Sequence, residues 1–266
     1  QAFGAPAKLD VVKVGQDVGA LTLTAVIDDA ARAKLNFNSG PRIRGPLTLK
    51  LKAPLDKSGA DVEIDLAKTT MESFGGPPWK SAGKPGKATL QIKPGPDGVQ
   101  VNNLVIEAGT LNARGSALFA NEGALKSLKL APLRMSAADD LRLDLDGGER
   151  PKLTLRGASL DMRGFIKGLT GGESDSHEAR DLDVDVKVGA AIGNNREQIN
   201  NFELSGVRRN GSFTSLESRG KIGQGSFSTR GSEGGVIVIK SDDAGALARF
   251  LDVYGKMEGG QIDLSV

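Results

Sequence analysis

The chain has 266 residues, with 35 Lys and Arg against 33 Asp and Glu, one His and no Cys. The net charge of +2, with the basic residues spread along the chain, gives no electrostatic reason to expect nucleic acid as a partner. Without cysteine there are no disulfides or thiolate metal sites, and one histidine leaves catalytic triads and histidine metal clusters without their usual parts. We therefore expect no enzyme, no cofactor and no metal.

Aliphatic and polar residues alternate in one run after another. In chain order, the runs fall at residues 21–25, 47–52, 61–67, 90–92, 99–101, 141–146, 153–155 and 181–188. Successive side chains of a strand point to opposite faces, so each run has one apolar and one polar face. This pattern is typical of antiparallel sheets, because parallel strands in α/β folds are apolar on both faces. The sequence thus predicts a mainly antiparallel all-β fold with one or two short helices.

Glycine, proline and asparagine separate the runs. Asn210-Gly211 is typical of a tight two-residue hairpin. Residues 75–86 form the longest irregular stretch and are the best candidate for a linker or boundary, and residues 170–178 are the next best. We therefore divide the chain into an N-terminal β segment (1–75), a first β repeat with a short helix (87–169), and a second β repeat with a C-terminal helix and strand (181–266).

The division into repeats depends on a short segment that occurs twice. Residues 100–106 read QVNNLVI and residues 198–204 read QINNFEL. An Arg-Gly pair follows each copy, first Arg114-Gly115 and then Arg219-Gly220. Further along, each copy is followed by a segment with helical spacing. Such self-similarity indicates an elongated sheet that grew by duplication.

The second of these helical segments has the clearer signature. Asp242 is a candidate N-cap, Gly255 a candidate stop, and four apolar residues follow helical spacing, namely Leu247, Phe250, Leu251 and Tyr254. A helix this short does not persist alone in water, so we expect it to cap the open end or the apolar face of the sheet. Residues 162–169 predict a weaker helix of the same kind.

Several polar residues could be interpreted as functional, but a structural role explains each of them better. His177 lies in a polar stretch and is expected to be solvated. Asp144, Asp146 and Glu149 lack the spacing of a calcium loop and fit a strand followed by a turn. Asp181, Asp183 and Asp185 share one face, where they oppose edge-to-edge aggregation more plausibly than they bind a cation.

The aliphatic faces leave two architectures open. Two sheets could close over each other as a sandwich, or one long sheet could curl into a trough. Scarce aromatics (4% of residues), the repeat and the capping helix favour the trough. Such a trough exposes more apolar surface than a soluble monomer tolerates, so it needs a ligand, and a lipid tail fits. The residues expected to line this groove are Leu47, Leu49, Leu51, Val62, Ile64, Leu66, Leu141, Leu143, Leu145, Val184, Val186 and Val188.

The C-terminal part resembles a known family. Residues 243–247, 250–255 and 257–262, with the strands before them and residues 160–165, are similar to the C-terminal signature of AsmA-like proteins. The nearest subgroup is the YhdP- and TamB-type bridge-like lipid transfer proteins of alphaproteobacteria. The resemblance covers roughly residues 100–266.

This resemblance implies an elongated β-taco in the periplasm, which carries phospholipid acyl chains in a hydrophobic groove between the inner and outer membranes. It also implies partners at both membranes, reached through other parts of the full-length protein. The chain begins with Gln and has no stretch long enough to span a membrane, so we expect it to be a piece of a longer protein with its inner-membrane anchor elsewhere.

Two alternatives remain open. The aliphatic faces could form the dry core of a β-sandwich that acts as a structural or envelope-assembly scaffold without a lipid ligand. A carbohydrate-binding or adhesin-like β protein is the third reading, and the low aromatic content argues against it.

Overall fold

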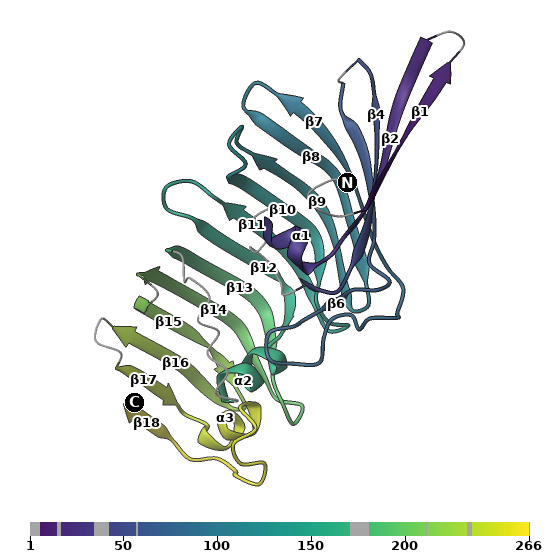
Figure 1. The fold of residues 1–266 in the computed structure, drawn as a ribbon. Helices are drawn as coiled ribbons and strands as arrows, with labels where there is room; N and C mark the ends of the chain where they lie inside the picture. The colour runs from purple at the N-terminus through teal and green to yellow at the C-terminus, as the bar shows by residue number, and fades with distance from the viewer. Residues whose placement is uncertain are drawn as a thin grey trace. The chain divides into compact units, whose positions relative to one another are not determined.

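The computed structural model describes residues 6–14, 17–34, 43–56, 58–170, 181–210, 212–232 and 236–265 (Figure 1). Among these residues, sixteen strands form one mostly antiparallel sheet that does not close, because β1 and β18 each have one neighbouring strand there. The predicted all-β class and the curled, mainly antiparallel sheet are confirmed. The chain divides into two compact units, which are described separately.

Unit 1 comprises Gln1–Ser73 and Pro77–Ser136. Its eight sheet strands, in spatial order, are β1 (Ala7–Val14), β2 (Asp17–Ile27), β4 (Leu47–Pro54), β5 (Ala60–Asp65), β7 (Gly86–Gly95), β8 (Gly98–Ala108), β9 (Leu111–Phe119) and β10 (Leu125–Arg134). The neighbouring strands of this unit pair antiparallel, so each strand turns back beside the one before it. A separate two-stranded pairing joins β3 (Ile43–Arg44) to β6 (Thr70–Met71).

Unit 2 comprises Phe74–Gly76 and Ala137–Val266. Its sheet strands are β11 (Asp140–Asp146), β12 (Lys152–Asp161), β13 (Leu182–Ile192), β14 (Gln198–Arg209), β15 (Ser212–Ile222), β16 (Gly225–Ser232), β17 (Ile237–Ser241) and β18 (Ile262–Ser265). One pair, β12 with β13, is parallel. A parallel pair needs a crossover, and helix α2 (Arg163–Thr170) lies in that connection.

The structure has three helices among its described residues, one more than expected. The extra helix, α1 (Asp29–Lys34), begins where the Asp28 carboxylate accepts a hydrogen bond from the Ala31 amide at 2.8 Å. Its Arg32 is buried and donates to the carbonyls of Ile43 and Gly45 at 3.0 and 2.8 Å. With six residues it is too short to show an apolar period in the sequence. No helix among the described residues is long and apolar enough to cross a membrane.

The predicted C-terminal helix exists as α3 (Ala244–Phe250), but its predicted ends are wrong. Asp243 is the N-cap and accepts from the Ala246 amide at 2.9 Å, whereas Asp242 accepts from the Ser226 amide of β16. The helix ends at Phe250, with Leu251 as C-cap, because Asp252 takes a left-handed conformation with φ 59°. Tyr254 therefore lies outside the helix, and Gly255 does not terminate it.

The sequence repeat corresponds to a repeated structure. The two Asn-Asn pairs lie in β8 and β14, and in both strands the pairing register shifts at that point, which marks a β-bulge. Because the bulge adds one residue, Ile199 and Phe202 both end up buried although they are three residues apart. The hairpin predicted after β14 is also present, since Arg209 pairs with Ser212, but Gly211 lies outside the described residues.

The candidate boundary at residues 75–86 is irregular, as expected, but it is not a loose linker. Lys80 is 2% exposed and Trp79 is buried beside it. The Lys80 ammonium donates to the carbonyls of Thr69, Ser81 and Ala67 at 2.7, 3.1 and 3.3 Å. Phe74 belongs to unit 2, where its ring stacks on Phe165 of α2 with the centroids 4.9 Å apart.

The other candidate boundary, residues 170–178 with His177, lies outside the described residues except for Thr170 at the end of α2. The boundary between the compact units follows Ser136 and thus falls inside the predicted segment 87–169. The three-segment division by repeats stays a prediction.

Candidate functional site

The predicted aliphatic residues of unit 2 form one face of its sheet. Cross-strand partners point to the same side, so the register defines which residues share a face. One row of partners runs through all eight strands without a break: Leu143, Leu155, Val186, Leu204, Ser218, Thr229, Ile239 and Leu264. A parallel row contains Leu145, Leu153, Val184, Gly206, Leu216, Gly231 and Ile237. We call this side the apolar face of unit 2.

Unit 1 has an apolar face of the same construction. Its unbroken row contains Ala7, Ala25, Leu49, Ile64, Ala88, Ile106, Ala113 and Leu133. A second row runs through Leu9, Leu23, Leu51, Val62 and Leu90. Leu47 and Leu66 share this face because they lie two residues from Leu49 and Ile64. Within each unit, therefore, the structure brings the predicted groove residues together on one face.

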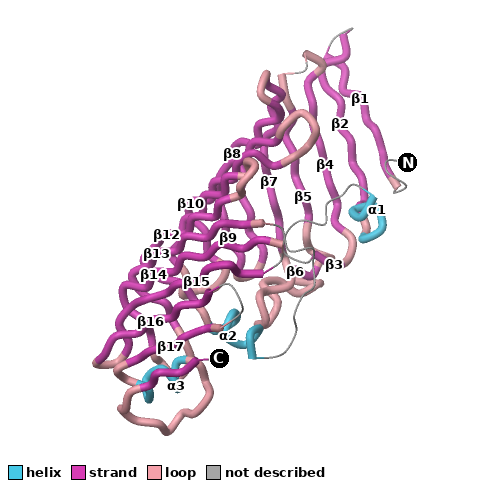
Figure 2. Tube along the Cα trace, turned by 90° about the vertical axis from the view of Figure 1, so that its left-hand side faces the viewer, coloured by secondary structure: helices cyan, strands magenta, loops and turns pink. Residues whose placement is uncertain are grey.

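No second sheet is stacked on either apolar face among the described residues. The only other sheet they contain is the two-residue pairing of β3 with β6 (Figures 1 and 2). The apolar faces are nevertheless unevenly exposed. Five predicted residues are buried, and they are Val62, Leu66, Leu141, Val186 and Val188. Seven are half-buried, and they are Leu47, Leu49, Leu51, Ile64, Leu143, Leu145 and Val184.

On the apolar face of unit 2, side chains are more buried toward the strand ends where α3 docks. Phe250 and Leu247 of α3 are buried there, as predicted, while Leu251 is half-buried and Tyr254 is exposed. A side chain at Gly193, beyond β13, would collide with the Phe250 ring, and one at Gly223 would come within 2.9 Å of the Ala246 methyl. The Asn194 amide also donates to the Phe250 carbonyl at 3.0 Å. Helix α3 thus closes one end of the apolar face.

The opposite, polar face of unit 2 is covered by ion pairs between neighbouring strands. Arg156 binds Asp185 at 2.7 Å, and this hydrogen bond holds the pKa of Asp185 below its ordinary value. The acidic residues Asp183 and Asp185, predicted to lie on a wet face, do so, and Asp183 pairs with Arg209 at 2.6 Å. Asp181 lies just before β13, where its carboxylate accepts from the Asn210 amide.

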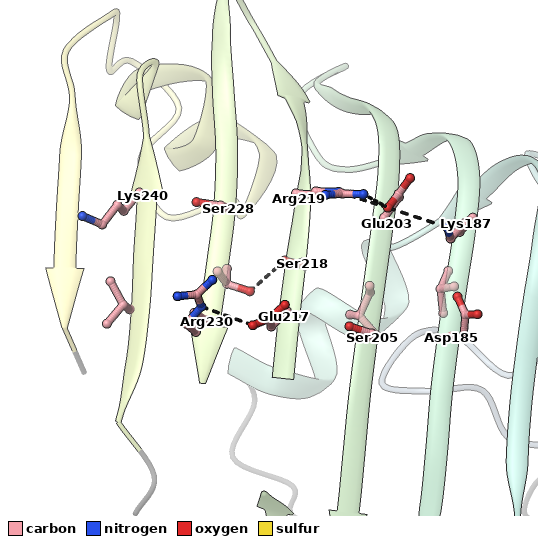
Figure 3. Close-up of a pocket in the computed structure, with 14 residues that line it drawn as sticks. Asp185, Lys187, Glu203, Ser205, Glu217, Ser218, Arg219, Ser228, Arg230 and Lys240 are labelled. Carbon is pink, nitrogen blue, oxygen red and sulfur yellow. Dashed lines mark hydrogen bonds and ion pairs between the residues drawn. The ribbon is translucent and has the colours of Figure 1, made fainter. Parts of the chain in front are cut away.

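A hollow of about 850 Å³ is lined mainly by charged and polar residues of this face, and Val186, Leu204, Ser218 and Thr229 of the apolar row also border it (Figure 3). Its walls carry Arg219 paired with Glu203 at 2.6 Å, Arg230 paired with Glu217 at 3.2 Å, and Lys187 at 3.9 Å from Glu203. The charges satisfy one another across strands, so the hollow fits a solvated surface better than a reaction site. The alternation pattern gives no signal for this hollow, because it depends on how the sheet curves.

Among the described residues, no group of His, Cys, Asp and Glu could hold a metal ion. Asp144 and Asp146 lie on the polar face of β11, and the Asp146 carboxylate accepts from the Gly148 amide at 3.1 Å in the following turn. This contact agrees with the turn expected there. Besides helix α1, the sequence reasoning missed the burial of Lys80, for which the sequence contains no signal, and the role of Asp243 as the cap of α3.

Comparison with family models, with curated proteins and with solved structures gives no match to this chain.

Proposed function

We propose that this chain is a non-enzymatic segment of a lipid conduit, in which phospholipid acyl chains lie along the apolar faces. The observation that carries the proposal is a row of cross-strand partners that is apolar across all eight strands of unit 1 and across six of the eight strands of unit 2, in a sheet that does not close and bears no second sheet among its described residues. A soluble protein rarely leaves so continuous an apolar surface without an occupant.

The chemistry of the rows suits a varied hydrocarbon guest. Most of their residues are Leu, Val, Ile and Ala, which interact by burial without directional preference, so tails of different length and saturation are accommodated. The two hydroxyl residues of the unit 2 row, Ser218 and Thr229, satisfy each other through a hydrogen bond of 2.7 Å. Eight strands at about 4.8 Å spacing give a row about 34 Å long, and a six-residue strand is about 20 Å long. One leaflet of a bilayer core is about 15 Å thick, so an acyl chain fits along either direction.

The half-buried residues are the ones proposed to touch lipid. In unit 2 these are Leu143, Leu145 and Val184, and in unit 1 they are Leu47, Leu49, Leu51 and Ile64. The buried residues, such as Val188 and Leu141, have little surface left for a guest and act as the support of the face. The structure therefore narrows the set of twelve residues that the sequence suggested.

The setting of the proposal follows from the resemblance to AsmA-like proteins. We infer a periplasmic position, as one segment of a longer inner-membrane-anchored protein that passes phospholipid between the inner and outer membranes. The partners at the two membranes would then be reached through other parts of that protein.

Site-specific photo-crosslinking tests the proposal. A photo-reactive amino acid at Val184 should capture phospholipid in cells, and lipid extraction with mass spectrometry should find phospholipid in the purified protein. The matched control is Glu217, which lies in the same unit on the polar face. Capture at Val184 without capture at Glu217 supports the proposal, whereas equal capture, or no lipid by either method, overturns it.

A scaffold remains a second candidate because of one observation. Five of the twelve predicted residues are buried without any ligand, as expected of a protein core. If the half-buried rows also serve only as core, charges introduced there will unfold the protein, whereas charges on a lipid-facing surface will leave it folded.

A further inference from the structure

Three exposed apolar side chains of unit 2 cluster in the loop that joins α3 to β18, residues 251–261. Val253 is 71% exposed, Tyr254 59% and Met257 38%. All residues from 252 to 261 are exposed. An exposed apolar side chain is common on its own, but three of them within five residues of one loop indicate a binding surface.

Hydrogen bonds to α3 fix the loop backbone in the conformation that exposes these three side chains. The Val253 amide donates to the Ala248 carbonyl at 3.0 Å, and the amides of Ala244 and Gly245 donate to the carbonyls of Gly260 and Gly259 at 2.8 and 2.9 Å. Arg249 of α3 donates to the Met257 carbonyl. The close approach requires glycine at position 245, where a side chain would meet the loop backbone at 2.7 Å.

The loop lies at an extremity of unit 2, as both ribbon and tube views show (Figures 1 and 2). It extends from the helix that closes one end of the apolar face through Phe250 and Leu247. Whatever binds the loop is therefore held next to that end.

We propose that residues 253–257 insert into the interfacial layer of a lipid bilayer and place the α3 end of the apolar face against the membrane. The inference rests on the proposed function and adds the point at which lipid would be exchanged. Tyrosine, with an apolar ring and a polar hydroxyl, suits the layer between head groups and tails, and Lys256 can extend its ammonium to the water.

Area and charge favour a bilayer over a protein partner. A stable protein interface needs about 800 Å² on each side, which three side chains on a loop do not provide, whereas interfacial insertion needs only shallow burial of a few residues. Asp252 and Glu258 offset the charge of Lys256, so attraction to anionic lipid contributes little. Binding should therefore be driven by apolar insertion and depend weakly on salt.

An environment-sensitive fluorophore at position 253 tests this inference directly. The chain has no cysteine, so Val253→Cys provides a unique attachment point for an NBD label. With phosphatidylcholine vesicles we expect a blue shift and a severalfold rise in emission that persist in 0.5 M salt. The control is Glu217→Cys on the polar face of β15, where the Glu217 side chain is 59% exposed.

Response at position 253 and not at 217 supports the inference. No response at 253, or an equal response at both positions, overturns it. Adding Tyr254→Asp and Met257→Asp to the labelled Val253→Cys protein should lower vesicle partitioning by about tenfold or more, because each removes apolar burial from the contact. These residues are exposed, so the thermal melt should stay unchanged.

The outcome is distinguishable from that of the proposed function. Vesicle binding reports only the loop, while lipid extraction and crosslinking at Val184 report only the apolar face. Lipid on the apolar face without vesicle binding would end this inference alone, and vesicle binding without lipid on the apolar face would end the conduit alone.

Discussion

Asn103 and Asn201 occupy equivalent positions in the two units, each in a left-handed conformation, with φ 51° and 50°. Each is the second residue of an Asn-Asn pair at a β-bulge, in β8 and β14 respectively. Opposite each bulge the next strand carries an Arg-Gly pair. A side chain at Gly115 would meet the Lys129 carbonyl, and one at Gly220 would meet Ile199, so both glycines are required sterically. The repeat thus encodes a bend in the sheet.

The first prediction concerns this bulge. Asn201→Leu should lower the free energy of unfolding by about 1–2 kcal/mol, because residues other than Gly, Asn and Asp are strained in the left-handed region. Asn201→Gly should be close to neutral. Urea denaturation measures both, and Asn200→Leu is the control, since that neighbouring exposed residue has no positive φ. Equal losses at both positions would contradict a conformational role for Asn201.

The second prediction concerns the buried ammonium of Lys80 in unit 1. Lys80→Met keeps most of the side-chain volume but leaves the carbonyls of Ala67, Thr69 and Ser81 without this donor. We expect a loss of about 2 kcal/mol in urea denaturation, because the Thr69 carbonyl loses the Lys80 donor, whereas the Ala67 and Ser81 carbonyls still accept from the amides of Gly83 and Lys84. The exposed Lys84→Met should change stability by less than about 0.5 kcal/mol.

Lys80 also predicts a pH dependence with a definite sign. Burial lowers the pKa of Lys80 below its ordinary value. In the unfolded chain the pKa of Lys80 has its ordinary value of about 10.4, so the unfolded state holds this proton more tightly than the folded state does. The free energy of unfolding should therefore rise as the pH increases from the folded pKa of Lys80 to about 10.4. The slope of stability against pH just below pH 10 should be smaller in Lys80→Met than in the unchanged protein. Identical slopes would contradict the shift.

Much of the fold is readable from the sequence because its governing feature is local. Every second residue of a strand lies on the same face of the sheet. Leu143, Val186 and Leu204 therefore share a face, because each occupies an apolar position in the alternation of its own strand. The hairpin after Arg209 is equally local, since the turn chemistry of Asn210 determines it. The presence of α3 follows from a short apolar period.

What escaped prediction depends on contacts between distant residues. Lys80 is buried because carbonyls from residues 67, 69 and 81 converge on it, and nothing near Lys80 in the sequence differs from an exposed lysine. Helix α3 stops early because Asp252 turns the chain. The division of the apolar face into buried and half-buried residues depends on α3 and on the curvature of the sheet, so Val184 and Val188 look alike in sequence but differ in the fold.

The third prediction concerns the cap of α3. The Asp243 carboxylate accepts from the amides of Ala246 and Gln224, and these hydrogen bonds hold its pKa below the ordinary value. Asp243→Ala should cost about 0.5–2 kcal/mol. A depressed pKa in the folded state contributes stability above the unfolded value of about 3.9, and this is lost as pH falls through the folded pKa. Asp243→Asn should keep part of the cap and make the stability depend less on pH in the acid range. Thermal melts between pH 2 and 5 would show this.

The last prediction separates conduit from scaffold with two changes on one strand. Val184 and Val188 lie on the same face of β13, but Val184 is half-buried and Val188 is 5% exposed. Val188→Asp should lower the free energy of unfolding by about 3 kcal/mol or more, since it buries a charge without a partner.

In a conduit, Val184→Asp should cost only about 1 kcal/mol, because its carboxylate reaches the water of an open face. The variant should remain folded by circular dichroism and yet retain much less phospholipid on extraction. Asp185, next in sequence on the polar face, provides the control, and Asp185→Asn should keep the lipid. If Val184→Asp unfolds the protein as completely as Val188→Asp, and the unchanged protein holds no lipid, the half-buried rows are core and the chain is a scaffold.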